Sequence, residues 1–166
     1  MPLRSTLQAF RPLAFAKWSH WAPLPLRLIV GYGFLAHGLA KLLKGPENFV
    51  AIVDAIGVPM PALMGWLAIL VELLCGVAMI VGIFVPLLII PMLAVLAVAM
   101  FAVHLPFGFS SIKLMAVTAA GPKFGPPGYE TDLLYAACIA ALALTGPGPF
   151  AVDNWLFSKL ANRRHD

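Results

Sequence analysis

Glu72 is the residue of this sequence whose type and position most directly suggest chemistry. It is the only Asp, Glu, Lys or Arg between Asp54 and Lys113, and it lies in an apolar run from Met64 to Gly82 that is long enough to cross a bilayer. A carboxylate at that depth is costly, and such groups usually face a protein partner or a water-filled cavity. Glu72 could bind the polar head of a ligand, move protons, or form a buried structural pair.

Two basic residues in the preceding apolar run, His37 and Lys41, are the candidate partners of Glu72. They are one helical turn apart and therefore share a helix face. At the rise of an α-helix, His37 lies about 9 Å, Lys41 about 3 Å and Glu72 about 13 Å below the same end of the predicted bundle. Lys41 could instead extend its ammonium group to the membrane surface. Small residues on both faces would let the two helices approach closely; they are Gly31, Gly38, Ala68, Cys75 and Gly76.

Further polar residues flank the predicted spans. His104 closes the third span, as a site residue or as a cap at the interface, and Glu130 and Asp132 begin the fourth at the same end. Arg27 lies near the face that carries His37 but at the opposite end, and it is expected to anchor the membrane interface. Six titratable groups from four spans would thus gather in one half of the bundle, with Glu72 the deepest.

Several other chemistries are not indicated by the sequence. Cys75 and Cys138 lie on different predicted helices at different depths, without a CxxC motif, and are expected to pack rather than react. His and Glu do not recur at metal-ligand spacing, so neither zinc nor haem is expected. The sequence contains neither a Gly-rich phosphate loop nor a nucleophile elbow.

The elements that must position these residues are membrane helices. The chain is 61% hydrophobic and only 11% charged, whereas a soluble domain has about 25% charged residues. We predict an all-α fold, a bundle of four transmembrane helices over Leu24–Leu43, Leu63–Ile83, Leu87–Leu105 and Thr131–Thr145. This transmembrane domain spans residues 24–157. Residues 1–23 would form a basic amphipathic helix at the interface or a partly ordered tail, and residues 158–166 a basic tail.

The placement of charge predicts the orientation. The formal net charge is +4, and the basic residues gather at the two ends: Arg4, Arg11, Lys17, Arg27, Lys159, Arg163 and Arg164. This distribution is an orientation signal, not a nucleic-acid surface, and it places both termini in the cytoplasm. The longest outer loop then runs from Pro106 to Glu130. Its Ile112–Val117 part could form a short interfacial or re-entrant helix, whereas Gly121–Gly128 cannot be regular helix.

Motifs along the chain resemble the DoxX family of small four-helix bacterial membrane proteins. The resemblance covers about residues 24–157 and rests on the order of individually weak motifs. They are Arg27-Leu-Ile-Val-Gly31, Phe34-Leu-Ala-His37-Gly38-Leu-Ala-Lys41, Ala55-Ile-Gly-Val-Pro59, Leu70-Val-Glu72-Leu-Leu-Cys-Gly76, His104, Gly128-Tyr-Glu130 before Leu133-Leu-Tyr135, and Gly146-Pro-Gly148 before Val152-Asp153. One departure is the Pro- and Gly-rich stretch Gly121–Gly128, which leaves the specificity of the outer loop open.

The resemblance implies a multi-pass protein of the bacterial inner membrane. Some relatives are subunits of thiosulfate–quinone oxidoreductase, and others join membrane-bound redox or detoxification assemblies. The recurrent polar positions of the family correspond here to Arg27, His37, Lys41, Glu72, His104 and Glu130.

From the resemblance and the polar cluster we expect a quinone-associated subunit of a membrane oxidoreductase. His37 and Lys41 would donate hydrogen bonds to the quinone carbonyl oxygens, and Glu72 would relay the accompanying proton. His104 and Glu130 would form the outer mouth, and a partner protein or soluble donor would supply the electrons. One alternative is a non-catalytic scaffold that tethers a soluble enzyme, and another is a small-solute transporter, against which stands the absence of an inverted repeat. The sequence leaves the oligomeric state open, with a homo-oligomer among the alternatives.

Overall fold

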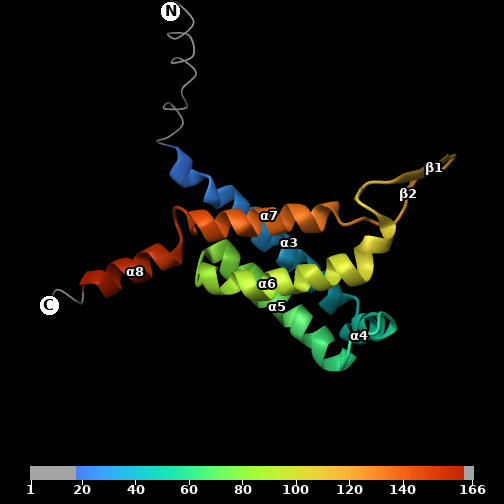
Figure 1. Cartoon of the computed structure of the whole chain (residues 1–166), viewed down its shortest axis with the longest axis horizontal. Helices are drawn as coiled ribbons and strands as arrows, with labels where there is room; N and C mark the ends of the chain where they lie inside the picture. The colour runs from blue at the N-terminus through green and yellow to red at the C-terminus, as the bar shows by residue number, and fades with distance from the viewer. Residues whose placement is uncertain (1–17, 163–166) are drawn as a thin grey trace, which may run out of the picture.

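A computed structural model describes residues 18–162 of the chain. Four helices form its body: α3 (Pro23–Leu43), α5 (Pro61–Val81), α6 (Val85–Val98) and α7 (Glu130–Thr145). In Figure 1, α6 and α7 lie side by side, and α3 and α5 cross them at an angle. The remaining elements are η1 (Ser19–Trp21), α4 (Pro46–Ala55), the π-helix η2 (Ala99–His104), η3 (Leu105–Phe107), β1 (Leu114–Thr118), β2 (Gly121–Phe124) and α8 (Val152–Asn162).

The four predicted helices are present, and their bounds differ from the prediction by no more than two residues at any end when η2 and η3 are counted as the continuation of α6. The bounds follow from local chemistry. Pro23 and Pro61 open α3 and α5, where a missing backbone N–H costs nothing. Gly82, at a φ of 75°, ends α5 in the left-handed conformation that glycine adopts without strain.

Within residues 18–162, three helices are long and apolar enough to cross a membrane: Ser19–Leu43, Pro61–Val81 and Val85–Phe107. The fourth helix, α7, has 16 residues, fewer than the roughly 20 that a span usually needs. It nevertheless returns the chain to the end of the bundle at which α3 begins, because the Trp21 and Phe150 rings lie 5.5 Å apart there. The fourth crossing and the cytoplasmic termini remain predictions.

The connection between η3 and α7 differs from the all-α prediction. The expected helix at Ile112–Val117 is wrong, since Leu114–Thr118 pairs antiparallel with Gly121–Phe124 in a hairpin that projects from the bundle (Figure 1). The stretch is too short for a stable helix and is followed at once by glycine and proline, so the two strands satisfy their backbone groups across the turn. The prediction that Gly121–Gly128 is not helical is correct.

Two short helices were not predicted. Helix α4 opens at Pro46 after Gly45 and packs against the first turns of α5, where Val50 contacts Gly65. Helix α8 continues across the expected boundary between residues 157 and 158. The amphipathic segment predicted for residues 1–23 falls largely on residues 1–17, outside the described residues.

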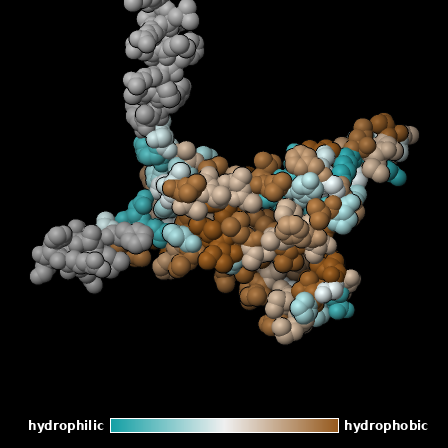
Figure 2. All heavy atoms as spheres, viewed as in Figure 1, coloured by the Kyte–Doolittle hydropathy of each residue, from teal (hydrophilic) through white to brown (hydrophobic). Residues whose placement is uncertain are grey.

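Close packing of α3 on α5 organises the core. A Cβ added to Gly76 would lie 2.7 Å from the backbone nitrogen of Leu35 and 2.9 Å from the carbonyl oxygen of Gly31, so the small-residue faces predicted from the sequence do meet. The buried core spans all four helices and contains Val30, Phe34, Cys75, Met79, Val85, Met92, Ile139 and Leu142. Outside it, exposed apolar side chains cover much of the visible face (Figure 2), as expected for a surface solvated by lipid.

Candidate functional site

The side chains of Lys41 and Glu72 form an ion pair between α3 and α5. Lys41 Nζ donates a hydrogen bond to Glu72 Oε1. The Glu72 side chain is 7% exposed and that of Lys41 is 23% exposed, so the carboxylate is enclosed and Lys41 is the more exposed member of the pair. Gly38 makes the approach possible, because a Cβ at that position would lie only 3.0 Å from Glu72 Cβ.

An aromatic ring lies against the ammonium group of this pair, and one oxygen of its carboxylate has no hydrogen-bond partner within residues 18–162. Lys41 Nζ lies 4.4 Å from the centroid of the Phe49 ring, an arrangement that favours the cation. Phe49 belongs to α4, so the unpredicted helix covers the pair. Glu72 Oε2 is buried and has no hydrogen-bond partner among the described residues. A buried polar atom without a partner is costly, which makes this oxygen an available acceptor.

His37 does not join this pair. Its side chain is exposed on α3, and within residues 18–162 no hydrogen bond or ion pair connects it to Glu72. Gly38 occupies the centre of the face that meets α5, and a neighbouring residue points about 100° away from that face. Of the two partners considered from the sequence, Lys41 is the one that the structure brings to Glu72.

A second acid–base pair joins the ends of η2 and α7. His104 Nδ1 and Asp132 Oδ2 are 2.6 Å apart, and the Asp132 side chain is 8% exposed. His104 is the last residue of the π-helix η2. A π-helical turn holds an extra residue, which changes the face presented by the residues that follow, and such turns are frequent at functional sites.

Glu130 does not pair with His104 in this arrangement. Its Oε2 accepts a hydrogen bond from the backbone nitrogen of Ser111 at 2.9 Å, so it holds the loop after η3 against the start of α7. The structure thus pairs His104 with Asp132 and not with Glu130, and an outer mouth that includes His104 and Glu130 remains a prediction. The sequence did place Asp132 at the start of the fourth helix, but nothing in it favoured this carboxylate over Glu130.

Arg27 lies at the opposite end of the bundle from both pairs. It is 2% exposed. Its Nη1 donates to the carbonyl oxygen of Pro147 at 2.8 Å, and its Nη2 to that of Pro149 at 3.5 Å. The expectation that Arg27 anchors the lipid interface is wrong, because the loop between α7 and α8 folds over it and supplies carbonyl acceptors that replace water.

Asp153 completes the polar cluster around Arg27 and was not singled out from the sequence. Its carboxylate accepts hydrogen bonds from the backbone nitrogens of Phe84 at 2.7 Å and Val85 at 3.0 Å, the first N–H groups of α6. Its own nitrogen donates to the carbonyl oxygen of Gly82 at 3.0 Å. Asp153 thus fastens the start of α8 to the turn between α5 and α6.

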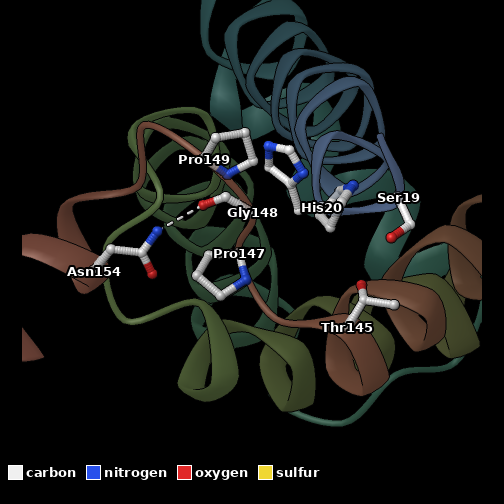
Figure 3. Close-up of a pocket in the computed structure, with 8 residues that line it drawn as sticks. Ser19, His20, Thr145, Pro147, Gly148, Pro149 and Asn154 are labelled. Atoms are coloured by element: carbon white, nitrogen blue, oxygen red, sulfur yellow. Dashed lines mark hydrogen bonds between the residues drawn. The ribbon is translucent and has the colours of Figure 1, made fainter. Parts of the chain in front are cut away.

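An open hollow of about 570 Å³ adjoins this clasp at the same end. Figure 3 shows it between the first turn of α3, the end of α7 and the start of α8, with Asn154 Nδ2 donating to the carbonyl oxygen of Gly148 at 2.8 Å. The hollow does not include Lys41, Glu72, His104 or Asp132. No group of three or more His, Cys, Asp or Glu side chains within residues 18–162 could hold a metal ion.

Comparison with known proteins connects these helices to a family. The model of the DoxX family matches residues 22–105, from the start of α3 to the end of η2. The chain belongs to the DoxX family. The match includes Arg27, His37, Lys41, Glu72 and His104, whereas Glu130 and Asp132 lie beyond it.

A relative from Haemophilus influenzae extends the similarity over nearly the whole chain. It is described as an uncharacterized protein and is 29% identical over an alignment of 159 residues, which covers 93% of this chain and 99% of the relative. No solved structure matches the chain. The family and the apolar helices make this DoxX protein a multi-pass membrane protein.

Proposed function

We propose that this DoxX protein is a quinone-associated subunit of a membrane redox system, located in the bacterial plasma membrane with both termini in the cytoplasm. The observation that carries the proposal is the Lys41–Glu72 pair, an acid–base pair held between two apolar helices with one carboxylate oxygen unpartnered. Ionisable groups inside a membrane are costly, and they are retained where a ligand or a proton uses them.

The residues of the pair fit the headgroup of a quinone. A quinone offers carbonyl oxygens as acceptors, and the corresponding quinol offers hydroxyl donors. Lys41, the more exposed member of the pair, offers Nζ as a donor, and Glu72 Oε2 is a buried acceptor without a partner among the described residues. When bound, a quinone takes up two electrons and two protons to become a quinol. The electrons would come from a partner protein that carries a redox centre.

The chain itself would bind the headgroup and exchange the proton. Lys41 would donate to a headgroup oxygen, and Glu72 would hold the exchanged proton at Oε2. His37, exposed one turn away from Lys41 on α3, would supply a second donor from the lipid side. The ring of Phe49 would keep water away from the pair, which strengthens every electrostatic interaction within it.

Substitution of Glu72 tests this proposal. Glu72→Gln keeps the size of the side chain and removes its acid–base chemistry, so we expect loss of quinone-linked turnover in the purified complex with the helical fold retained. Glu47→Gln is the matched control, because Glu47 is an exposed carboxylate on α4 near the same end of α3. Unchanged turnover per folded molecule in Glu72→Gln would leave the pair a purely structural role and would sink the proposal.

The projecting hairpin favours a second candidate function, a scaffold that attaches a partner protein to the membrane. All five residues of β1 are exposed, and Leu114, Met115, Val117 and Phe124 are among the exposed large apolar residues of the molecule. Contiguous apolar surface outside a packed core marks interaction sites. Replacing residues 112–125 by a short Gly-Ser linker should then remove a stoichiometric partner recovered in mild detergent, whereas Glu72→Gln should retain it. Equal recovery from both variants would contradict the scaffold.

A further inference from the structure

A groove between α6 and α7 lies apart from the Lys41–Glu72 pair. One face of α6 and its continuation contributes Leu93, Leu96, Ala97 and Met100, and one face of α7 contributes Asp132, Leu133 and Ala136. These two helices lie side by side (Figure 1). The hollow has a volume of about 230 Å³, and its lining is apolar except at Asp132.

The polar end of the groove has hydrogen-bonding capacity to spare. Asp132 is 6% exposed, and its Oδ2 bonds His104 Nδ1. Its second oxygen, Oδ1, and the Nε2 atom of His104 make no hydrogen bond within the described residues. An imidazole nitrogen donates or accepts according to its tautomer, and a carboxylate oxygen accepts. Of the two side chains only Asp132 lines the groove, so a ligand at this end would meet a carboxylate oxygen that accepts a hydrogen bond, on a side chain held in place by His104.

The size and position of the groove restrict the ligand. Pockets for whole drug-sized molecules are about 300–1,000 Å³, so about 230 Å³ holds a single ring and leaves a longer tail outside. The rims at Ala97 and Leu133 are exposed, on helices that otherwise present apolar side chains outward. A ligand would therefore enter sideways from the lipid, with its ring between the helices.

We propose that this groove is a lateral binding site for the ring headgroup of a lipid-soluble quinone or quinol, oriented by the His104–Asp132 pair. The inference rests on the proposed function for its ligand class, but it assigns a site on other helices and with other residues. A quinol hydroxyl would donate to Asp132 Oδ1. The apolar side chains of Leu96 and Met100 would pack against the ring. A lipid acyl chain could fill the same space but would make no use of the buried carboxylate.

The test is photolabelling of the full-length protein in phosphatidylcholine nanodiscs. The probe is an azido-quinone with a short alkyl tail, with and without excess decyl-quinone, and the labelled peptides are identified by mass spectrometry. We expect label that decyl-quinone displaces in residues 93–104 and 130–136. Label confined to α3 and α5 would overturn the groove while leaving the proposed function standing. Label that decyl-quinone does not displace anywhere would overturn both.

Variants separate ring binding from contact with bulk lipid. Ala136→Phe fills the groove and should remove the displaceable label from both segments. Ala137→Phe is the matched control, because Ala137 is the next residue of α7, is exposed and does not line the groove. Asp132→Asn keeps the shape of the side chain but removes its charge, and it should raise the dissociation constant of the probe about tenfold. Equal labelling of Ala136→Phe and Ala137→Phe would identify the label as contact with lipid-dissolved probe and refute the site.

Discussion

Substitutions of Lys41 and Glu72 can separate the structural role of the pair from its chemical role. Lys41→Met removes the only hydrogen-bond partner, within residues 18–162, of a carboxylate whose side chain is 7% exposed. Removing one member of a fully buried pair costs about 3–5 kcal/mol. Because the Lys41 side chain is 23% exposed, water screens part of that attraction, and we expect the lower end, about 3 kcal/mol.

The loss of stability in Lys41→Met arises because Glu72 remains buried without its partner. In the double variant Lys41→Met, Glu72→Met no charge is stranded, so the free energy of unfolding should recover by about 1–3 kcal/mol relative to the sum of the two single variants. Reversible unfolding in mixed detergent micelles, followed by circular dichroism, measures all four proteins. Lys44→Met is the control, because Lys44 is exposed at the end of the same helix, and it should change stability by less than about 0.5 kcal/mol.

Two results would refute this reasoning. If the effects of the two single substitutions on the free energy of unfolding simply add in the double variant, the two side chains do not interact in the folded protein. If the double variant recovers both its stability and full quinone-linked turnover, the pair fixes the helices and takes no part in chemistry. The proposed function requires that the double variant recovers its stability but loses quinone-linked turnover.

Two further predictions concern the packing around the site. Gly76→Val should lower the free energy of unfolding by about 1–3 kcal/mol, because the added atoms meet the backbone of α3 at Leu35, which cannot move aside cheaply. The control Val77→Ile, on the exposed face of α5, should change the free energy of unfolding by less than about 0.5 kcal/mol. Equal effects of the two substitutions would show that α3 does not pack on Gly76. Arg27→Met should speed hydrogen exchange and proteolysis at residues 146–151, because it removes the donors of two loop carbonyls, and Arg27→Lys should restore protection only in part, since a lysine cannot reach both acceptors in a fork. Unchanged exchange in Arg27→Met would mean that the loop is held by other contacts.

The sequence predicted the four main helices because long apolar runs bounded by proline and glycine carry that information locally. It also placed Gly31, Gly38 and Gly76 on the faces that pack, since helical phase alone is enough to align small residues. It missed α4 and the hairpin, because both lie in connections of mixed composition. Their form depends on what they pack against, or on a partner strand across a turn, and not on a repeating pattern.

The site was predictable in outline but not in its pairing. Helical spacing limited the candidate partners of Glu72 to His37 and Lys41. Which of the two pairs with Glu72 depends on the face of α3 that contacts α5, and the centre of that face is Gly38. The sequence placed His104, Glu130 and Asp132 at the same end without choosing a partner for His104; the structure pairs it with Asp132, because the π-helical turn and the start of α7 set the directions of both side chains. The apolar spacing of a regular helix does not predict a π-helical turn.

The two ends of the bundle use buried charge in different ways. At the end of the bundle where α3 begins, both terminal nitrogens of Arg27 bond to loop carbonyls, its side chain is nearly inaccessible, and Asp153 binds the backbone N–H groups of Phe84 and Val85 at the start of α6. Such a network holds three chain segments together. At the other end, Lys41 is partly exposed and Glu72 keeps a buried oxygen free. A structural pair needs neither accessibility nor a spare acceptor, whereas a site that exchanges protons with a ligand needs both. This difference is why we assign stability to Arg27 and chemistry to Glu72.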